Sequence, residues 1–313
     1  MLNRRHIRVK VMQSIYAMHQ SGSDNLEKQE KFLIASIENS IELYLILVSI
    51  LVEIRTKELL FIAVSKKKHL ATPEERNPNL KFVENTVLIG LEQNYSLNKG
   101  LENYKITNWQ KNDDTILILL QEVKKSDVYL AYMQELNKSF DLDKQFVADI
   151  FEKVIAPNEK LFSYLEDFKL TWVDDFPLIN TEILKQLRNF PKETEDFRIP
   201  KLYKDIEDRD FALHLFRKTI LNEAKLAKEF ADKTPNWDMD RIAELDTIVL
   251  KMAIAELLYF ASIPVKVTIN EYLEIAKEYS TPKSSIFING ILDNLAKEFK
   301  NDDRLKKIGR GLM

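Results

Sequence analysis

The chain has 313 residues, 45% of them hydrophobic and 30% charged, which is typical of a folded protein with about two domains. Six glycines and nine prolines are too few for many-stranded sandwiches or glycine-rich nucleotide loops, so we expect an all-α fold. The lack of cysteine excludes disulfides, thiolate nucleophiles and zinc ribbons. Because the net charge is −3, any nucleic-acid site must be a local patch.

The first predicted helix covers residues 4–20, where Ile7, Val11, Ile15 and Met18 recur on one helical face. A break at residues 21–24 precedes a long helix over about 25–64, which contains the apolar run Leu43–Val52. Ten apolar residues are too few to cross a bilayer, which needs about 20, so we expect a buried helix there. The polar segment 66–78 predicts a loop.

Prolines divide the middle of the chain into predicted helices near residues 80–103, 113–137, 143–156, 158–170 and 179–190. Towards the C-terminus we expect helices over about 204–233, 239–261 and 268–280, and a further helix that starts at Thr281-Pro282. Thr268 and Glu271 have the spacing of a capping box. The basic tail, residues 304–310, is predicted to be frayed.

No pattern for a catalytic or cofactor site occurs. There is no GxxxxGK[ST], GxGxxG, GxSxG or HExxH, and the four histidines have no metal-ligand spacing. We therefore expect no enzyme, no cofactor and no metal centre. The N-terminus MLNRRHIRVK lacks the apolar core of a signal peptide, so we expect a cytoplasmic protein with no membrane contact.

The first 20 residues contain four cations (Arg4, Arg5, Arg8 and Lys10) and no acid. Lysine and arginine bind phosphates through counterion release, and arginine also stacks on unpaired bases. The amphipathic helix would hold these charges in a fixed array, and Tyr16 would add a stacking surface. Two alternatives stay open here: a solvated basic terminus, and a partly buried core tyrosine.

A series of short segments follows in a fixed order between Trp237 and Leu295. They are Trp237 with Asp240-Arg241-Ile242, then Leu250–Leu257, Ile263-Pro264, Val267–Glu271, Glu274–Lys277 and Phe287–Asp293. Phe211 with Leu215, and Arg4, Arg5, Arg8, Gln13 and Tyr16 near the N-terminus, fit the same pattern. In this order the segments resemble the NusB family of bacterial transcription antitermination factors.

The resemblance covers residues 1–20 and about 205–300. It implies two packed helical bundles, with an additional helical region inserted between them. We expect the N-terminal helices of this fold over residues 1–64, the inserted region over 65–203, the C-terminal bundle over 204–300 and a basic tail over 301–313.

The resemblance also implies a function. Such proteins bind the single-stranded boxA element of ribosomal-RNA leader transcripts together with the ribosomal protein NusE, and so load an antitermination complex onto RNA polymerase. Carried over to this sequence, the RNA-binding residues are Arg4, Arg5, Arg8, Tyr16 and Phe287, and Asp246 faces the protein partner. In the loop Thr281–Ser285, Lys283 departs from the family pattern, and we expect its charge to strengthen phosphate contact.

The sequence has two alternative interpretations of its function. Similar helical domains precede some ribosomal-RNA cytosine methyltransferases, but this chain has neither their glycine-rich sheet domain nor a cysteine. A non-catalytic helical scaffold that uses the inserted region for protein contacts is the other alternative. Individual residues also have ordinary structural interpretations: Glu256 is expected to pair within the bundle, and Phe287 is either a core aromatic or a stacking surface.

Overall fold

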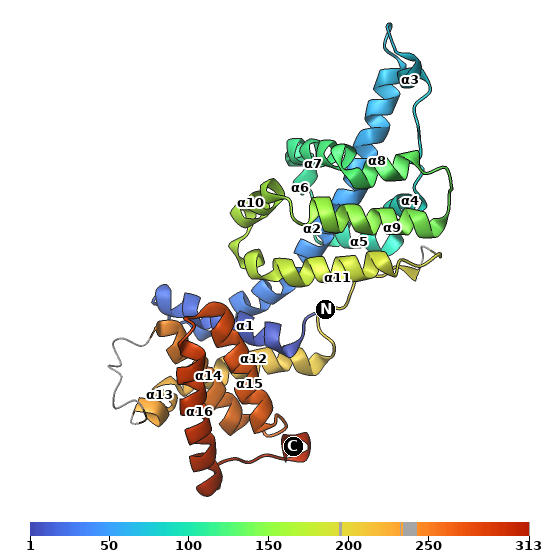
Figure 1. Cartoon of the computed structure of the whole chain (residues 1–313). Coiled ribbons are helices and arrows are strands. Elements are labelled where there is room, and N and C mark those ends of the chain that lie inside the picture. Colours follow the sequence, from blue (N-terminus) through green and yellow to red (C-terminus); the bar gives the residue numbers. More distant parts are fainter. Residues whose placement is uncertain (194–195, 232, 234–242, 313) are drawn as a thin grey trace. The chain divides into compact units, whose positions relative to one another are not determined.

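The computed structural model describes residues 1–193, 196–231, 233 and 243–312, and its regular structure within these ranges is helical throughout (Figure 1). The all-α prediction is therefore confirmed for this part of the chain. None of its helices combines the length and the apolar character that crossing a membrane requires. Trp237 and Asp240-Arg241-Ile242 lie outside the described residues.

The chain forms two compact units. Unit 1 consists of Met1 with Glu38–Leu202, and unit 2 consists of Leu2–Ile37 with Tyr203–Met313. The boundary falls inside the long helix α2 (Leu26–Lys66), so residues 38–64 pack with the region expected to be inserted. The predicted boundaries between the family-like regions, the inserted region and the tail, at residues 64, 203 and 300, stay a prediction.

Unit 2 is built around α1, whose apolar face is buried as predicted, with Ile7, Val11 and Ile15 at most 1% exposed. Asn3 caps this helix by accepting a hydrogen bond from the amide of His6 at 3.0 Å. Besides the first part of α2, the helices of unit 2 are α1 (Arg4–Gln20), α12 (Ile206–Leu221), α13 (Glu223–Ala231), α14 (Glu244–Tyr259), α15 (Val265–Tyr279) and α16 (Ser284–Asn301).

Two predicted helix starts in unit 2 are wrong. α15 begins at Val265, directly after Pro264, and no capping box forms, because the side chains of Thr268 and Glu271 bond to other helices. The last helix begins at Ser284 rather than at Thr281-Pro282. The predicted helix over 204–233 is divided at Asn222.

The tail after α16 is ordered, so the prediction of a frayed end is wrong. Arg304 donates two hydrogen bonds to Glu229, at 3.0 and 2.6 Å. The amide of Ile308 donates to the Ala261 carbonyl at 3.0 Å, and the Lys307 ammonium donates to the Phe260 carbonyl at 2.9 Å. The short 3-10 turn η5 (Gly309–Leu312) follows. These bonds attach the tail to α13 and to the segment that connects α14 with α15.

Unit 1 surrounds the second half of α2. Two predicted helices are each divided in two, because Asn94 and Ser126 accept hydrogen bonds from Leu97 and Tyr129 and so cap new helices. The elements are α3 (Pro73–Arg76), α4 (Thr86–Gln93), α5 (Tyr95–Asn103), α6 (Asn108–Lys111), α7 (Asp113–Lys125), α8 (Asp127–Gln134), α9 (Phe140–Ile150), η1 (Phe151–Ile155), α10 (Glu159–Phe168), η2 (Leu170–Asp175) and α11 (Phe176–Arg188).

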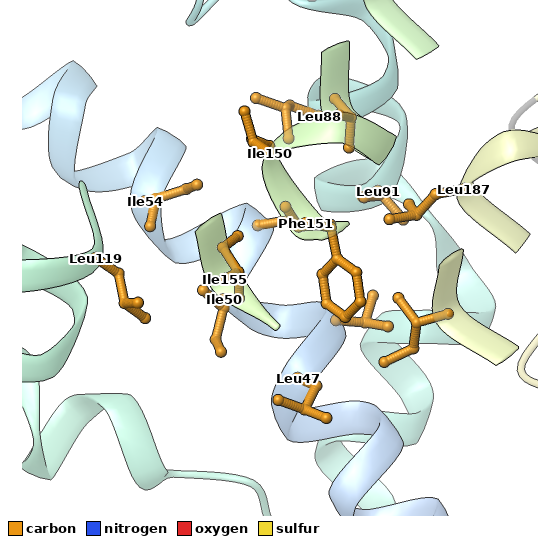
Figure 2. Packing of buried hydrophobic residues seen from close by; sticks show 14 of the residues in the cluster. Leu47, Ile50, Ile54, Leu88, Leu91, Leu119, Ile150, Phe151, Ile155 and Leu187 are labelled. Carbon is orange, nitrogen blue, oxygen red and sulfur yellow. The ribbon is translucent and has the colours of Figure 1, made fainter. Parts of the chain in front are cut away.

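The core of unit 1 forms where the apolar run of α2 meets α4, η1 and α11. Figure 2 shows the Phe151 ring among Leu47 and Ile50 of α2, Leu91 of α4 and Leu187 of α11, and all five side chains are at most 1% exposed. The prediction of a buried helix over residues 43–52 is confirmed. This unit therefore has a hydrophobic core of its own.

Shortening one side chain of this core tests whether unit 1 has a core separate from that of unit 2. We expect Phe151→Ala to destabilise unit 1 by roughly 3–5 kcal/mol, the usual cost of removing a buried phenylalanine ring. Hydrogen exchange followed by mass spectrometry should show faster exchange in α4, α9 and α11, with little change in α14–α16. Leu170→Ala, at a side chain that is 75% exposed in the same unit, is the control. Equal acceleration in both units would contradict separate cores.

Candidate nucleic-acid interface

The first turns of α1 form one wall of a groove of about 600 Å³, and the segment leading into α15 forms the other. The three predicted arginines, Arg4, Arg5 and Arg8, all line it. The remaining lining residues are Asn3, Ser262, Ile263, Pro264, Val267 and Glu271. The three arginines therefore share one surface, and their contact with RNA stays a prediction.

The two outer arginines are partly exposed and paired with acids. Arg4 donates from Nε to Asp208 at 3.1 Å, and Arg5 donates from Nε and Nη2 to the two oxygens of Glu271 at 3.1 and 2.9 Å. Their side chains remain 39% and 41% exposed. The hydrogen bond to Glu271 raises the pKa of Arg5. Both guanidinium groups are therefore held in place at the groove but remain accessible to solvent.

Arg8 lies deeper, with only 2% of its side chain exposed. It donates to both oxygens of the buried Glu256 at 2.8 and 2.7 Å, and its guanidinium lies 5.1 Å from the centre of the Phe211 ring. Burial acts to lower the pKa of Arg8, and the Glu256 carboxylate more than offsets this, so the pKa lies above its usual value. The predicted RNA contact of Arg8 stays a prediction, and it requires this ion pair to open.

The acids of this groove are the main feature that sequence analysis missed. Asp208, Glu256 and Glu271 offset the charges of the three arginines. The prediction that Glu256 pairs within the bundle is confirmed by its two bonds from Arg8. An acid inside an apolar helical run requires such a partner. Its partner was not identifiable, since 248 residues separate the two. Burial and the neighbouring cations Arg5 and Lys10 lower the pKa of His6.

Tyr16 lies further along the same helix, about 12 Å from Arg8 for a rise of 1.5 Å per residue. Its side chain is 42% exposed and lines a hollow of about 410 Å³ that also includes Glu244 and Tyr279. α1 and α15 run in the same direction, because Arg5 pairs with Glu271 and Tyr16 shares the hollow with Tyr279. The arginine groove and this hollow therefore follow one another along these two helices.

Lys283 and Phe287 line a third hollow, of about 540 Å³, at the start of α16. Lys283 is exposed and Phe287 is half-buried. The loop before them is held by Ser284, whose hydroxyl lies 2.9 Å from that of Thr281 and donates to Asp246 at 2.6 Å. Lys283 is thus presented to solvent from a fixed loop.

Asp246 is buried and joins the start of α14 to the start of α16 through its bond to Ser284. One of its oxygens, Oδ1, has no hydrogen-bond partner among the described residues. This placement gives Asp246 a role in positioning the loop that carries Lys283. Its predicted contact with a protein partner stays a prediction.

Comparison with known proteins links the chain to a family. The NusB family model matches residues 178–297, which include most of α11, α12–α15 and most of α16. The transcription antitermination protein NusB of Salinibacter ruber is 46% identical over 116 residues, which are 37% of this chain and 72% of that protein. This chain belongs to the NusB family.

Other NusB proteins show the same partial overlap. NusB of Chloroherpeton thalassium is 44% identical over 109 residues, 35% of this chain and 52% of that protein. NusB of Geotalea uraniireducens is 36% identical over 117 residues, 37% of this chain and 78% of that protein. The solved T. maritima NusB is 30% identical, covering 44% of this chain and 85% of that one, with a TM-score of 0.30. Assignment to the NusB family therefore rests on the sequence matches.

Removal of Glu256 tests the structural importance of the buried pair. We expect Glu256→Ala to lower the free energy of unfolding by roughly 3–5 kcal/mol, because it leaves Arg8 charged in the core without its bidentate partner, and only the 3.5 Å contact of its Nη1 with Glu271 remains. Urea unfolding followed by circular dichroism measures this change. Glu27→Ala, which breaks an exposed pair with Lys31 in the same unit, should cost less than about 1 kcal/mol. A loss for Glu256→Ala as small as this control would contradict the assignment.

Proposed function

We propose that this NusB-family chain is a non-enzymatic RNA-binding antitermination factor of the cytoplasm. It binds boxA-like single-stranded RNA of ribosomal-RNA leader transcripts together with the ribosomal protein NusE, within an antitermination complex on RNA polymerase. The observation that supports this most directly is the groove at the start of α1. There, two partly exposed arginines lie beside α15, which is part of the segment that matches the family.

The pairing of these arginines is compatible with RNA capture. The bonds from Arg5 to Glu271 use Nε and Nη2, which leaves the Nη1 donors for a phosphate or a base edge. The acid partner also makes binding selective, because a polyanion gains little by simple attraction to a neutralised surface. An RNA that fits the groove recovers this cost through directed hydrogen bonds.

The RNA path continues from this groove along α1. Tyr16 offers a ring on which a base stacks, and such stacking tolerates any base because every base has a flat face. Lys283 and Phe287 would extend the surface beyond the end of α15, with the ammonium group meeting a phosphate. Acidic positions at the start of α14, such as Asp246, suit a basic ribosomal protein as partner.

Substitutions in the Arg5–Glu271 pair test the RNA surface in both directions. We expect Arg5→Ala to cost roughly 1–3 kcal/mol of binding free energy for boxA-like RNA. Glu271→Gln should strengthen binding, because it removes the acid that competes with phosphate. Fluorescence anisotropy with boxA-like and scrambled RNAs of equal length, with and without NusE, measures both changes.

The matched control is Arg217→Ala. Arg217 also pairs with a carboxylate through two hydrogen bonds in unit 2, to Glu30 at 2.5 and 2.6 Å, but lies outside the groove. Its loss should leave RNA affinity nearly unchanged. Equal losses for Arg5→Ala and Arg217→Ala would mean that only general charge matters, and would argue against a site at the groove.

Charge reversal at Lys283 tests the second part of the surface. We expect Lys283→Glu to weaken RNA binding and to make its salt dependence shallower, because a phosphate contact is lost and a repulsion is added. Lys297→Glu, at an exposed lysine of α16, the helix that follows Lys283, makes the same change of net charge away from the loop. A dissociation constant that Lys283→Glu leaves unchanged would exclude this contact.

The second candidate function is a helical scaffold for protein contacts. The observation that favours it is the neutralisation of all three arginines by acids. This alternative predicts that Arg4→Ala and Arg5→Ala leave RNA binding untouched and that no selectivity for boxA-like RNA exists, even with NusE present. The titrations described above therefore decide between the two functions.

A further inference from the structure

Unit 1 carries an open groove of about 880 Å³ at the start of α5. One wall is α5 itself, with Tyr95, Lys99 and Tyr104 just after its end. The other wall is the segment 198–202, which contains Arg198. Tyr95 is 74% exposed and Tyr104 is 45% exposed. Two large aromatic rings thus face solvent in one depression.

The second wall is fixed against α5 by specific bonds. Asn94 donates to the Phe197 carbonyl at 3.2 Å, and Ser96 accepts from the amide of Ile199 at 3.4 Å. Close packing is possible because residue 100 is glycine: a Cβ there would lie 2.4 Å from the Ile199 side chain. Arg198 is therefore carried by a segment that the fold holds beside Tyr95.

The charges of this groove differ from those of the arginine groove in unit 2. Within the described chain, its lining includes two cations, Lys99 and Arg198, and no acid. The Lys99 ammonium lies 5.6 Å from the centre of the Tyr95 ring. Burial is the main cause that raises the pKa of Tyr104, and the nearby carboxylates of Glu38 and Glu42 add to this effect. Glu42 is itself paired with Lys169. The described lining of the groove itself is thus cationic, while Arg198 also borders a neighbouring hollow that contains Glu182 and Asp196.

We propose that this groove is a second binding site for single-stranded RNA, separate from the arginine groove. Exposed rings with cations between them suit a strand whose bases stack and whose phosphates are neutralised. A small-molecule pocket would instead bury its aromatic side chains and enclose its ligand. Because stacking and phosphate contacts tolerate any base, the site binds flanking RNA without sequence preference. The proposal does not depend on boxA recognition in unit 2.

The test uses the full chain and a fluorescent, unstructured 20-nucleotide RNA without a boxA-like element. We expect Tyr95→Ala/Lys99→Ala/Arg198→Ala to raise the dissociation constant about tenfold or more. The slope of log affinity against log salt should become shallower by about 1.4, because each phosphate contact to a single strand contributes roughly 0.7. Tyr95→Phe should retain most of the affinity, because phenylalanine also stacks.

The matched control is Lys125→Ala/Lys160→Ala, which removes two exposed cations from unit 1 outside the groove. It should change the affinity much less than the groove variant does. Cross-linking with 4-thiouridine RNA should label residues 93–104 or 198–202 in the wild type, and thermal unfolding verifies that every variant is folded.

Equal affinities for the groove and control variants would overturn the proposal, as would cross-links confined to unit 2 or a wild type that does not bind this RNA. Loss of a protein partner with unchanged RNA binding would also overturn it and would assign the groove to protein recognition. Because the probe lacks boxA, failure here leaves the proposed function of unit 2 intact. Failure of boxA selectivity likewise leaves this site standing.

Discussion

The buried ion pair between Arg8 and Glu256 is the interaction on which the arrangement of unit 2 depends. Each charge alone would be costly in the core, and together they join α1 to α14. Thr268 donates to the same carboxylate at 2.8 Å and so attaches α15 as well. With these three helices fixed, Arg5 meets Glu271 and the groove forms between α1 and α15. These contacts hold the basic side chains of the N-terminal helix α1 in fixed positions on one surface.

The cations of the two grooves would meet a polyanion under different conditions. In unit 2, Arg4 and Arg5 are held by Asp208 and Glu271, so a ligand must replace or share these acids. This lowers affinity for any polyanion and favours one that matches the geometry. In unit 1, the described lining of the groove at α5 contains no acid, and the contact proposed there is unselective. A long transcript bound at both sites would gain from the effective concentration that its own chain provides.

Features that depend on neighbouring residues were predictable from the sequence. The buried face of α1 follows from its helical periodicity, and the buried run of α2 follows from its continuous apolar composition and its length; both are confirmed. The breaks at Asn94 and Ser126 depend on side-chain caps that are also local, but the flanking periodicity hid them. The capping box at Thr268 failed for a different reason. Its side chains had stronger partners on α14 and α1, more than ten and more than 250 residues away, which no local pattern indicates.

The contact between Asp246 and Ser284 connects the two kinds of partner in the proposed function. Asp246 belongs to the start of α14, where a protein partner is proposed, and Ser284 directly follows Lys283, a proposed RNA contact. Because one hydrogen bond of 2.6 Å joins them, a partner that moves Asp246 also changes the position of Lys283. Thermodynamic linkage then requires the effect to be mutual: RNA bound at the loop changes affinity for the partner by the same factor. Cooperation between the two ligands therefore needs no direct contact between them, only a shared and rigid connection between α14 and α16.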